Sequence, residues 1–254
     1  MTPELVRPPA DAPVRAAFSG RAGGVSRGPY AGLNLGASVG DRPADVRENR
    51  RRLCAALGLD EERVSLGRQV HGALVREVLA PPRPGRFTGA LTGWPEGDGL
   101  TTRVPGLPLV VLGADCLPVL LWRRDRPAVG AAHAGWRGLV AGVLESAVRA
   151  LGDPSRTAAA IGPGVGPCCY PTGAEVRESF ARRFGDRVVR GAAVDLAAAS
   201  RAALRAAGVP DGAIWTLAAC TSCERGRFYS YRRDGSATGR QAGVIWIEGG
   251  IGHR

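Results

Sequence analysis

The sequence predicts an α+β fold with mixed sheets in a single domain, and three features of the chain support this. Short apolar runs bounded by Gly, Pro or charged residues predict strands, segments with apolar residues at helical spacing predict helices, and the two kinds do not alternate strictly. The 254 residues are enough to bury most of the surface that the unfolded chain would expose. We therefore expect residues 1–13 to form a flexible leader and residues 14–254 to form the domain.

The strongest strand signal lies in the middle of the chain. Three short aliphatic runs, Leu107–Leu112, Pro118–Trp122 and Ala128–Ala132, predict buried strands. Cys116 lies between the first two runs, and His133 directly follows the third. A sheet fixes the backbone of residues at its strand ends and leaves their side chains free to face a cavity. The Cys116 thiol and the His133 imidazole can therefore meet although 16 residues lie between them. We expect a ligand to bind there.

The segments before this stretch predict two strands and one helix. Ala16–Ser19 is a short apolar run that leads into a Gly-rich loop carrying Asn34. Asp45–Leu57 is amphipathic, with three large apolar side chains on one face, and predicts a helix. Leu74–Leu79 predicts a strand, and the Pro- and Gly-rich connection Pro81–Pro95 is the best candidate for a mobile loop.

The segments after the central stretch predict three helices and four strands. Leu139–Leu151 carries apolar residues at helical spacing throughout its length. Ala174–Phe184 and Asp195–Ala207 are also predicted helices, and the Gly- and Pro-rich segment Gly162–Tyr170 predicts a rigid loop. The predicted strands are Thr157–Ile161, Ala213–Leu217, Arg227–Tyr231 and Gly243–Ile247.

Composition excludes several classes of function. All 34 basic residues are arginine, and the absence of lysine excludes Schiff-base and pyridoxal phosphate chemistry as well as a P-loop. The formal charge of +11 is spread over every predicted helix and loop without a long basic run, so we expect no nucleic-acid partner. Arginines remain compatible with a small anionic ligand such as phosphate.

The chain also lacks the sequence features of a membrane or exported protein. Its longest apolar runs fall short of the roughly 18 residues that a membrane helix needs, and Met1–Arg15 is too rich in Pro and charge for a signal-peptide core. We therefore expect a cytoplasmic protein with no membrane partner, in which the cysteines are mostly reduced.

Four of the six cysteines offer a second ligand set. Cys220 and Cys223 form a CxxC motif, and with Cys168 and Cys169 they could complete a four-thiolate structural zinc site. Adjacent cysteines do not easily chelate one ion without backbone strain, so simple buried thiols are the preferred interpretation. A thioredoxin-like redox role is disfavoured because the CxxC does not open a helix after a strand.

Two imidazoles and one thiolate, those of His71, His133 and Cys116, form a ligand set suited to zinc with one position open. These residues share no local spacing motif, and a lone His such as His71 is more often a polar loop residue. Arg137 lies in a Gly-containing turn before a predicted helix, which predicts an anion site or an ordinary turn. Arg50 is a structural arginine or an inward-pointing anion ligand.

Several motifs in the same order carry a family resemblance. RAGGVSRGPYAGLNLG, VRENR, QVHG, ADCLPVLL, AAHAGWRG, IGPGVGPCCY and RFYSYRRDGSATGRQAG together resemble the bacterial family long labelled multicopper polyphenol oxidase or laccase-like. That family is now described as purine nucleoside phosphorylases with added adenosine deaminase activity. The match extends from about Phe18 to Ile247. One departure is Gly97-Asp98-Gly99-Leu100, where the family usually reads Ala-Asp-Ala-Leu. This chain keeps the acidic residue of that motif as Asp98.

The resemblance implies a single catalytic domain with four layers ordered helix, sheet, sheet, helix. It places a metal ion, expected to be Zn²⁺, on His71, Cys116 and His133. It also implies adenosine, inosine, guanosine and 5′-methylthioadenosine as substrates, with phosphate as the nucleophile.

The remaining site residues are a mechanistic hypothesis. In it, Arg137 and Arg50 hold the anion, Asn34 and Gln69 hydrogen-bond ribose or base, and Asp98 or Asp115 is the general acid. The preferred nucleoside and the oligomeric state stay open.

Two other classes of function compete with this interpretation. In a metal-free cysteine hydrolase, His133 would activate Cys116 as a nucleophile, and the implied fold is similar to that of a cysteine-dependent bacterial toxin domain. A basic nucleic-acid-binding module is the non-enzymatic alternative. Laccase chemistry is not supported, because it needs many more than the three histidines of this chain.

Overall fold

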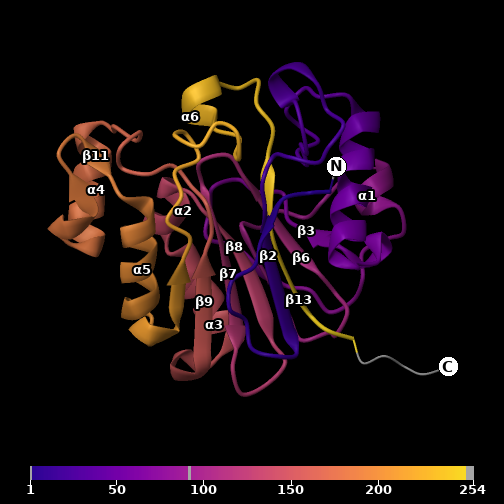
Figure 1. The fold of residues 1–254 in the computed structure, drawn as a ribbon. Coiled ribbons are helices and arrows are strands. Elements are labelled where there is room, and N and C mark those ends of the chain that lie inside the picture. The colour runs from indigo at the N-terminus through magenta and orange to yellow at the C-terminus, as the bar shows by residue number, and fades with distance from the viewer. Residues whose placement is uncertain (1, 91–92, 250–254) are drawn as a thin grey trace.

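Two mixed β-sheets pack face to face, and helices cover the outer face of each (Figure 1). The computed structural model describes residues 2–90 and 93–249. The predicted α+β class with four layers is confirmed. The five-stranded sheet has the order β1 (Leu5–Val6), β2 (Val14–Ser19), β13 (Gln241–Ile247), β6 (Leu109–Gly113), β3 (Ser65–Leu66). The six-stranded sheet has the order β12 (Ile214–Thr216), β9 (Thr157–Ile161), β7 (Leu117–Arg123), β8 (Val129–Ala134), β5 (Gly99–Thr102), β4 (Val75–Glu77).

Three apolar layers hold these elements together. The central layer lies between the sheets and takes Phe18 and Ile245 from one sheet and Leu120 and Ala160 from the other. The second layer lies between the six-stranded sheet and the helices α3 (Val143–Leu151) and α5 (Leu196–Ala206). The third layer lies under α1 (Pro43–Leu57), on the outer face of the five-stranded sheet. Burial of this apolar surface is the main force that holds both sheets in place.

The three central strands are confirmed, and they belong to different sheets. β6 lies in the five-stranded sheet, whereas β7 and β8 are antiparallel neighbours in the six-stranded sheet. The chain therefore crosses from one sheet to the other between Gly113 and Leu117. Asp115, at the centre of this crossing, has a φ of 94°, which is uncommon for a residue other than glycine.

The predicted helix Leu139–Leu151 is two helices, α2 (Trp136–Ala141) and α3. Gly142 separates them with a φ of 89°, a left-handed conformation that ends α2 and begins α3 at a new angle. The other predicted helices are confirmed as α1, α4 (Ala174–Phe184) and α5. A further short helix, α6 (Tyr231–Asp234), was not predicted.

The prediction of a strand at Arg227–Tyr231 is wrong. Arg227 lies in a turn, and Tyr231 begins α6. The backbone of the buried Tyr229 bonds to a side chain instead of a neighbouring strand: its N–H donates to Gln241 Oε1 at 2.9 Å, and its carbonyl accepts from Gln241 Nε2 at 3.2 Å. Ser230 then caps α6 by accepting a hydrogen bond from the N–H of Arg233.

Two predicted segments differ in detail. In the expected leader 1–13, Leu5–Val6 forms β1 and pairs with β2. The expected mobile connection Pro81–Pro95 contains a π-helical segment, Arg86–Ala90, whose Phe87 side chain is buried; residues 91–92 of this connection lie outside the described residues. Its mobility remains a prediction.

The helices of the described ranges 2–90 and 93–249 include none with both the length and the apolar character needed to cross a bilayer.

Candidate active site

A large cavity of about 1260 Å³ opens at the edge of the six-stranded sheet where β7 begins and β8 ends. This volume exceeds the range of roughly 300–1,000 Å³ that is usual for small-molecule pockets. The wall combines residues from distant parts of the chain: 36–39, 66–71, 112–116, 133–137, 170–176 and 231–240 all contribute. A cavity of this size can hold two small ligands side by side.

His71, Cys116 and His133 meet in this cavity. One ligand atom from each lies within 4.8 Å of the others. His71 comes from the loop between β3 and β4, Cys116 directly precedes β7, and His133 lies in β8 opposite Pro118. A tetrahedral zinc ion with bonds of about 2.0–2.3 Å would hold its ligand atoms roughly 3.3–3.8 Å apart. The three side chains therefore need only small adjustments to share one ion.

Asp98 fixes the two histidines. Its carboxylate is fully buried and accepts hydrogen bonds from the backbone N–H groups of Val70, His71 and Gly72 at 2.8–3.0 Å. These bonds hold His71 in a left-handed conformation with a φ of 62°, which would otherwise be unfavourable. The same carboxylate lies 2.9 Å from Nδ1 of His133.

The contact with Asp98 determines which nitrogen of His133 is free. A carboxylate beside Nδ1 favours the tautomer or the ion that carries a proton there, so Nε2 is the nitrogen that faces the cavity. The carbonyl of Asp98 also accepts the backbone N–H of His133 at 2.7 Å. A carboxylate behind a histidine is the usual outer partner of a histidine that ligates zinc.

The electrostatics of this cluster favour a thiolate. Burial alone would raise the pKa of Cys116, but the positive charge of His133 and hydrogen bonds from both histidines outweigh it and lower the pKa to about 6. Burial alone would lower the pKa of His133, but the Cys116 thiolate and Asp98 raise it to about 9. For Asp98, the effect of burial is outweighed by the hydrogen bonds from His133, Val70 and Gly72, which lower its pKa.

Gly135 leaves room for this cluster. A Cβ at this position would lie 2.7 Å from Sγ of Cys116 and 3.2 Å from Cδ2 of His71. A side chain at residue 135 would therefore crowd the Cys116 sulfur and the His71 ring. The small residue belongs to the AAHAGWRG motif, which places the imidazole and the gap two residues apart.

The rest of the wall is strongly basic. Five arginines line it, and Asp115 is the one acidic residue among the described lining residues: the arginines are Arg50, Arg68, Arg137, Arg232 and Arg240. Arg137 is exposed and lies against the Trp136 ring, 4.4 Å from its centroid, and no described residue forms a hydrogen bond or ion pair with its guanidinium. This guanidinium is available for an anionic ligand.

Arg50 also lines the cavity but is largely occupied by the protein. Its side chain is buried and donates to the carbonyls of Leu35 and Phe87 at 2.7–3.0 Å. It also lies 4.7 Å from the centroid of the Phe87 ring. Burial lowers the pKa of Arg50 to about 10, so it stays charged at neutral pH. Most N–H groups of the Arg50 guanidinium therefore bind the protein backbone, as expected for a structural arginine.

Asn34 and Asp98 are the two expected site residues that do not line the cavity. Asn34 is fully buried, and its amide bonds Gly36, Asp41 and the N–H of Arg240. Gln69 does line the wall, and its amide exchanges two hydrogen bonds with the backbone of Leu112 at 2.7 and 2.8 Å. The Asn34 side chain thus positions the backbone of Gly36 and Arg240, and the Gln69 side chain positions that of Leu112; all three of these residues line the cavity.

Both carboxylates that were expected to supply a general acid are committed to the protein. Asp98 is enclosed as described above. Asp115 lines the cavity, and its two oxygens accept hydrogen bonds from the Thr221 hydroxyl at 2.6 Å and from the backbone N–H of Arg232 at 2.5 Å. Asp115 thereby ties the crossing between the sheets to the Thr221 loop and to the first turn of α6.

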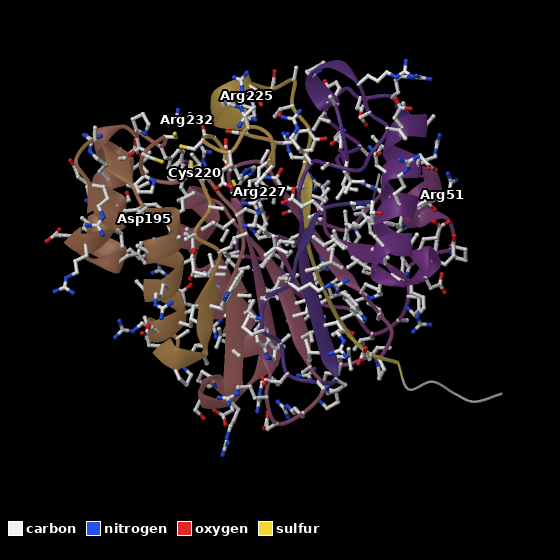
Figure 2. The ribbon with its side chains drawn as sticks, viewed as in Figure 1. Arg51, Asp195, Cys220, Arg225, Arg227 and Arg232 are labelled. Atoms are coloured by element: carbon white, nitrogen blue, oxygen red, sulfur yellow. The ribbon has the colours of Figure 1, made fainter. Side chains whose placement is uncertain are left out.

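Sequence reasoning missed several wall residues. Trp94, Trp136, Tyr170 and Tyr231 supply aromatic surface, and Arg240 supplies a half-buried cation. Tyr231 and Arg240 lie within RFYSYRRDGSATGRQAG, so this motif was the available signal. Figure 2 shows Arg232 and Cys220 at the top of the view, where Figure 1 places α6. Aromatic faces of this kind suit the stacking of a planar base.

The fold and site together define a class: a single four-layer α+β domain with a basic, aromatic pocket around a His–Cys–His cluster. Residues 15–248 match the family model described as "Multi-copper polyphenol oxidoreductase laccase". The chain belongs to this family, which confirms the resemblance carried by the motifs.

Two relatives and a solved structure match nearly the whole chain. The chain is 42% identical over 239 residues to a protein of Deinococcus radiodurans named purine nucleoside phosphorylase, covering 91% of this chain and 88% of that protein. It is 41% identical to purine nucleoside phosphorylase YfiH of Escherichia coli K12, covering 92% and 94%. The crystal structure of YlmD from Geobacillus stearothermophilus superposes with a TM-score of 0.87 at 37% identity, covering 94% and 93%.

The lowered pKa of Cys116 predicts its reactivity with alkylating reagents. In chelator-treated, metal-free protein, the thiolate is present above the folded pKa, so the rate of Cys116 alkylation should rise through pH 6 and level off by about pH 7–8. His133→Asn should move this midpoint upward. Mass mapping of the modified peptides measures the rate at each cysteine.

Cys54 is the internal control for this experiment. Burial raises its pKa to about 12, so it should stay unmodified over the same pH range. A midpoint for Cys116 near the ordinary value of 9, or one that His133→Asn leaves in place, would contradict the thiolate and imidazolium pair.

Proposed function

We propose that the protein is a zinc-dependent purine nucleoside phosphorylase that also deaminates adenosine. The observation that carries this proposal is the convergence of His71, Cys116 and His133 in a pocket lined by arginines and aromatic rings. The names of the relatives in Deinococcus radiodurans and Escherichia coli support the phosphorylase assignment. The proposed substrates are adenosine, inosine, guanosine and 5′-methylthioadenosine, each with phosphate.

The three side chains fit a zinc ion. Two imidazoles and a thiolate are a typical catalytic zinc set that leaves a fourth position for another ligand. The thiolate and the orientation of His133 by Asp98 support this choice. When bound, the ion would supply Lewis acidity and an open position for phosphate or water.

The remaining groups would bind and orient the substrates. The Arg137 guanidinium has no hydrogen-bond or ion-pair partner among residues 2–90 and 93–249, and we assign it to phosphate, with the half-buried Arg240 as a second positive charge. Phosphorolysis passes through a positively charged sugar, so catalysis depends on holding phosphate against C1′. Trp136 and Tyr170 offer aromatic faces for the purine.

Asp98 and Asp115 act as positioning residues in this proposal. Asp98 orients His133 and holds the His71 loop, and Asp115 holds Thr221 and Arg232. Gln69 keeps the β6 end of the wall in place, and Arg50 keeps the Leu35 and Phe87 carbonyls together. Substitution of these residues should therefore act through the geometry of the pocket.

Adenosine deamination would use the same site with the nucleoside in a second orientation. Water in place of phosphate would attack C6 of the purine, so the base, and not the sugar, must face the ligand cluster. The cavity volume of about 1260 Å³ leaves room for both orientations.

Copper oxidase chemistry, which the family description names, has little support in this chain. Multicopper centres are rich in histidine, and the complete sequence contains three histidines. Two of these belong to the cluster, and His253 lies outside the described residues.

A specific observation keeps the cysteine hydrolase as a second candidate. Cys116, His133 and Asp98 line up as nucleophile, base and orienting acid, the arrangement of a cysteine-dependent hydrolase. That mechanism has no role for His71, which also hydrogen-bonds Cys116. The third ligand favours the metal site.

Incubation of metal-quantified protein with adenosine tests the proposal. With phosphate, the products should be adenine and ribose 1-phosphate; inosine should form by deamination with or without phosphate. Cys116→Ser removes a metal ligand, and both rates should fall by more than about 100-fold, since changes behind the ligands alone cost about 10–100-fold. Zinc-free protein that forms neither product and is trapped at Cys116 by electrophiles would support the hydrolase instead.

Arg137→Gln tests the phosphate assignment. Loss of a charged hydrogen bond costs about 1.5–3 kcal/mol, which corresponds to a roughly 10–150-fold rise in the KM for phosphate. The rate of deamination should change little, because that reaction does not use phosphate. Arg149→Gln, at an exposed position of α3, is the matched control. An unchanged KM for phosphate would remove Arg137 from the proposed site.

A further inference from the structure

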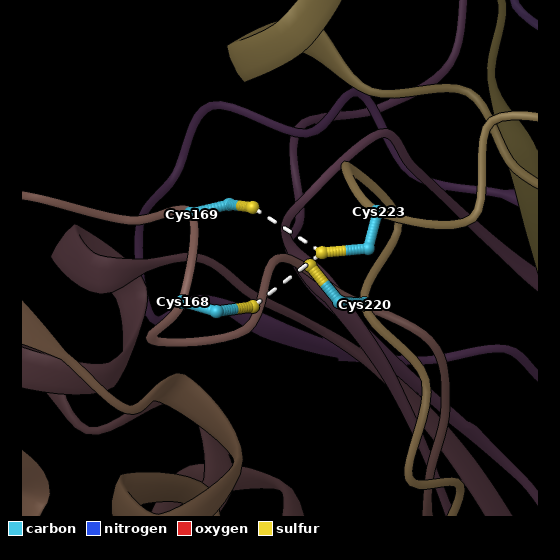
Figure 3. A group of neighbouring side chains, drawn as sticks. All are labelled: Cys168, Cys169, Cys220 and Cys223. Atoms are coloured by element: carbon cyan, nitrogen blue, oxygen red, sulfur yellow. Dashed lines mark hydrogen bonds between the residues drawn. The ribbon is translucent and has the colours of Figure 1, made fainter.

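A second group of ligand atoms lies outside the His–Cys–His cluster. The sulfurs of Cys168, Cys169, Cys220 and Cys223 all lie within 4.8 Å of one another (Figure 3). Sγ of Cys223 is 3.6 Å from Sγ of Cys168 and 3.4 Å from Sγ of Cys169. Four thiolates around zinc, with bonds of about 2.3 Å, would lie roughly 3.8 Å apart. The four sulfurs are therefore already near tetrahedral spacing.

Two loops far apart in the sequence bring these cysteines together. Cys168 and Cys169 follow β9, and Cys220 and Cys223 follow β12, which is the parallel neighbour of β9. The two loops stay paired beyond the strands, because the N–H of Thr221 donates to the carbonyl of Gly164 at 2.9 Å.

The adjacent cysteines do not prevent a shared ion. A turn closes between Gly166 and Cys169, whose N–H donates to the Gly166 carbonyl at 3.0 Å. In this turn both neighbouring side chains extend toward the Cys220 and Cys223 sulfurs (Figure 3). The expectation of simple buried thiols is wrong for two of the four, since Cys168 and Cys223 are exposed. The turn directs the two adjacent side chains toward the same point, so adjacency does not prevent a shared ion.

Hydrogen bonds hold the Cys220 sulfur and the backbone of the CxxC loop in place. The N–H of Gly166 donates to Sγ of Cys220 at 3.2 Å. The guanidinium of Arg233 donates to the carbonyls of Thr221 and Ser222, inside the CxxC, at 2.7 and 3.1 Å. Arg233 also pairs with Asp234 at 2.6 Å, so its contribution is to anchor the backbone of the CxxC loop.

We propose that Cys168, Cys169, Cys220 and Cys223 bind a second Zn²⁺ ion. Four thiolates fill a tetrahedral zinc ion and leave no open position, so the ion has a structural role. Its binding would connect the loop that carries Tyr170 to the loop that carries Thr221, which hydrogen-bonds Asp115. The ion thereby supports one wall of the pocket from behind. This proposal does not depend on the reaction assigned to the pocket.

Zinc counting in variant proteins tests the second site. After loading with excess Zn²⁺ and dialysis, the wild type should hold about two ions per chain, Cys116→Ser about one, and Cys116→Ser/Cys223→Ser essentially none. Cys54→Ser removes a buried cysteine remote from both groups and should keep both ions. Cobalt-loaded Cys116→Ser should show the thiolate-to-metal charge-transfer absorption of a sulfur-rich tetrahedral site.

Two results would overturn the second site. One is a zinc content near zero in Cys116→Ser protein that is folded by circular dichroism. The other is a mass decrease showing disulfides among the four cysteines in protein purified without oxidant, since sulfurs this close could also pair with each other. If the double variant fails to fold, the ion count in the wild type and in Cys116→Ser still decides between these outcomes.

Discussion

The carboxylate of Asp98 is the constraint on which the proposed site depends. It is buried, it accepts three consecutive backbone N–H groups from Val70 to Gly72, and it contacts Nδ1 of His133. One charge therefore holds an unfavourable loop conformation and selects the free nitrogen of a histidine in a different element. A buried carboxylate is costly unless it is fully hydrogen-bonded, and these contacts are what make it stable. They also make Asp98 unsuited to exchange protons with a substrate.

The two-sheet architecture explains why the site forms where it does. The chain leaves β6 in one sheet and enters β7 in the other, and Cys116 is presented at the end of this crossing. Asp115, in the same crossing, binds Thr221, so the pocket wall is continuous with the loops that carry the four cysteines. Strand β8 thus holds His133, and Cys116 directly precedes β7, whereas His71 lies in a loop whose backbone Asp98 holds. Loops also supply the basic and aromatic surface that would contact substrates.

Local patterns predicted much of this molecule, and the failures have tertiary causes. The spacing of apolar residues identified the buried strands and amphipathic helices, because each type of element buries its apolar side chains at a characteristic spacing. It did not detect the helix break at Gly142, since an isolated glycine is often tolerated inside a helix. It misassigned Arg227–Tyr231, because a side-chain amide from Gln241 satisfies that backbone where a strand would have been expected. The role of Asp98 was not predictable either, because its four partners meet only in the folded chain.

The zinc affinity of the pocket in Asp98→Asn tests the central claim most directly. The amide keeps the size of the carboxylate but removes its charge and turns an N–H₂ group toward backbone donors. Both proteins also carry Cys223→Ser, so that only the pocket binds zinc. The zinc affinity is measured by competition with a chromophoric chelator. Asp98→Asn should bind zinc about 10–100-fold more weakly than the protein with Asp98 intact. Asp195→Asn, at the start of α5, is the matched control. An unchanged affinity in folded Asp98→Asn protein would contradict the account.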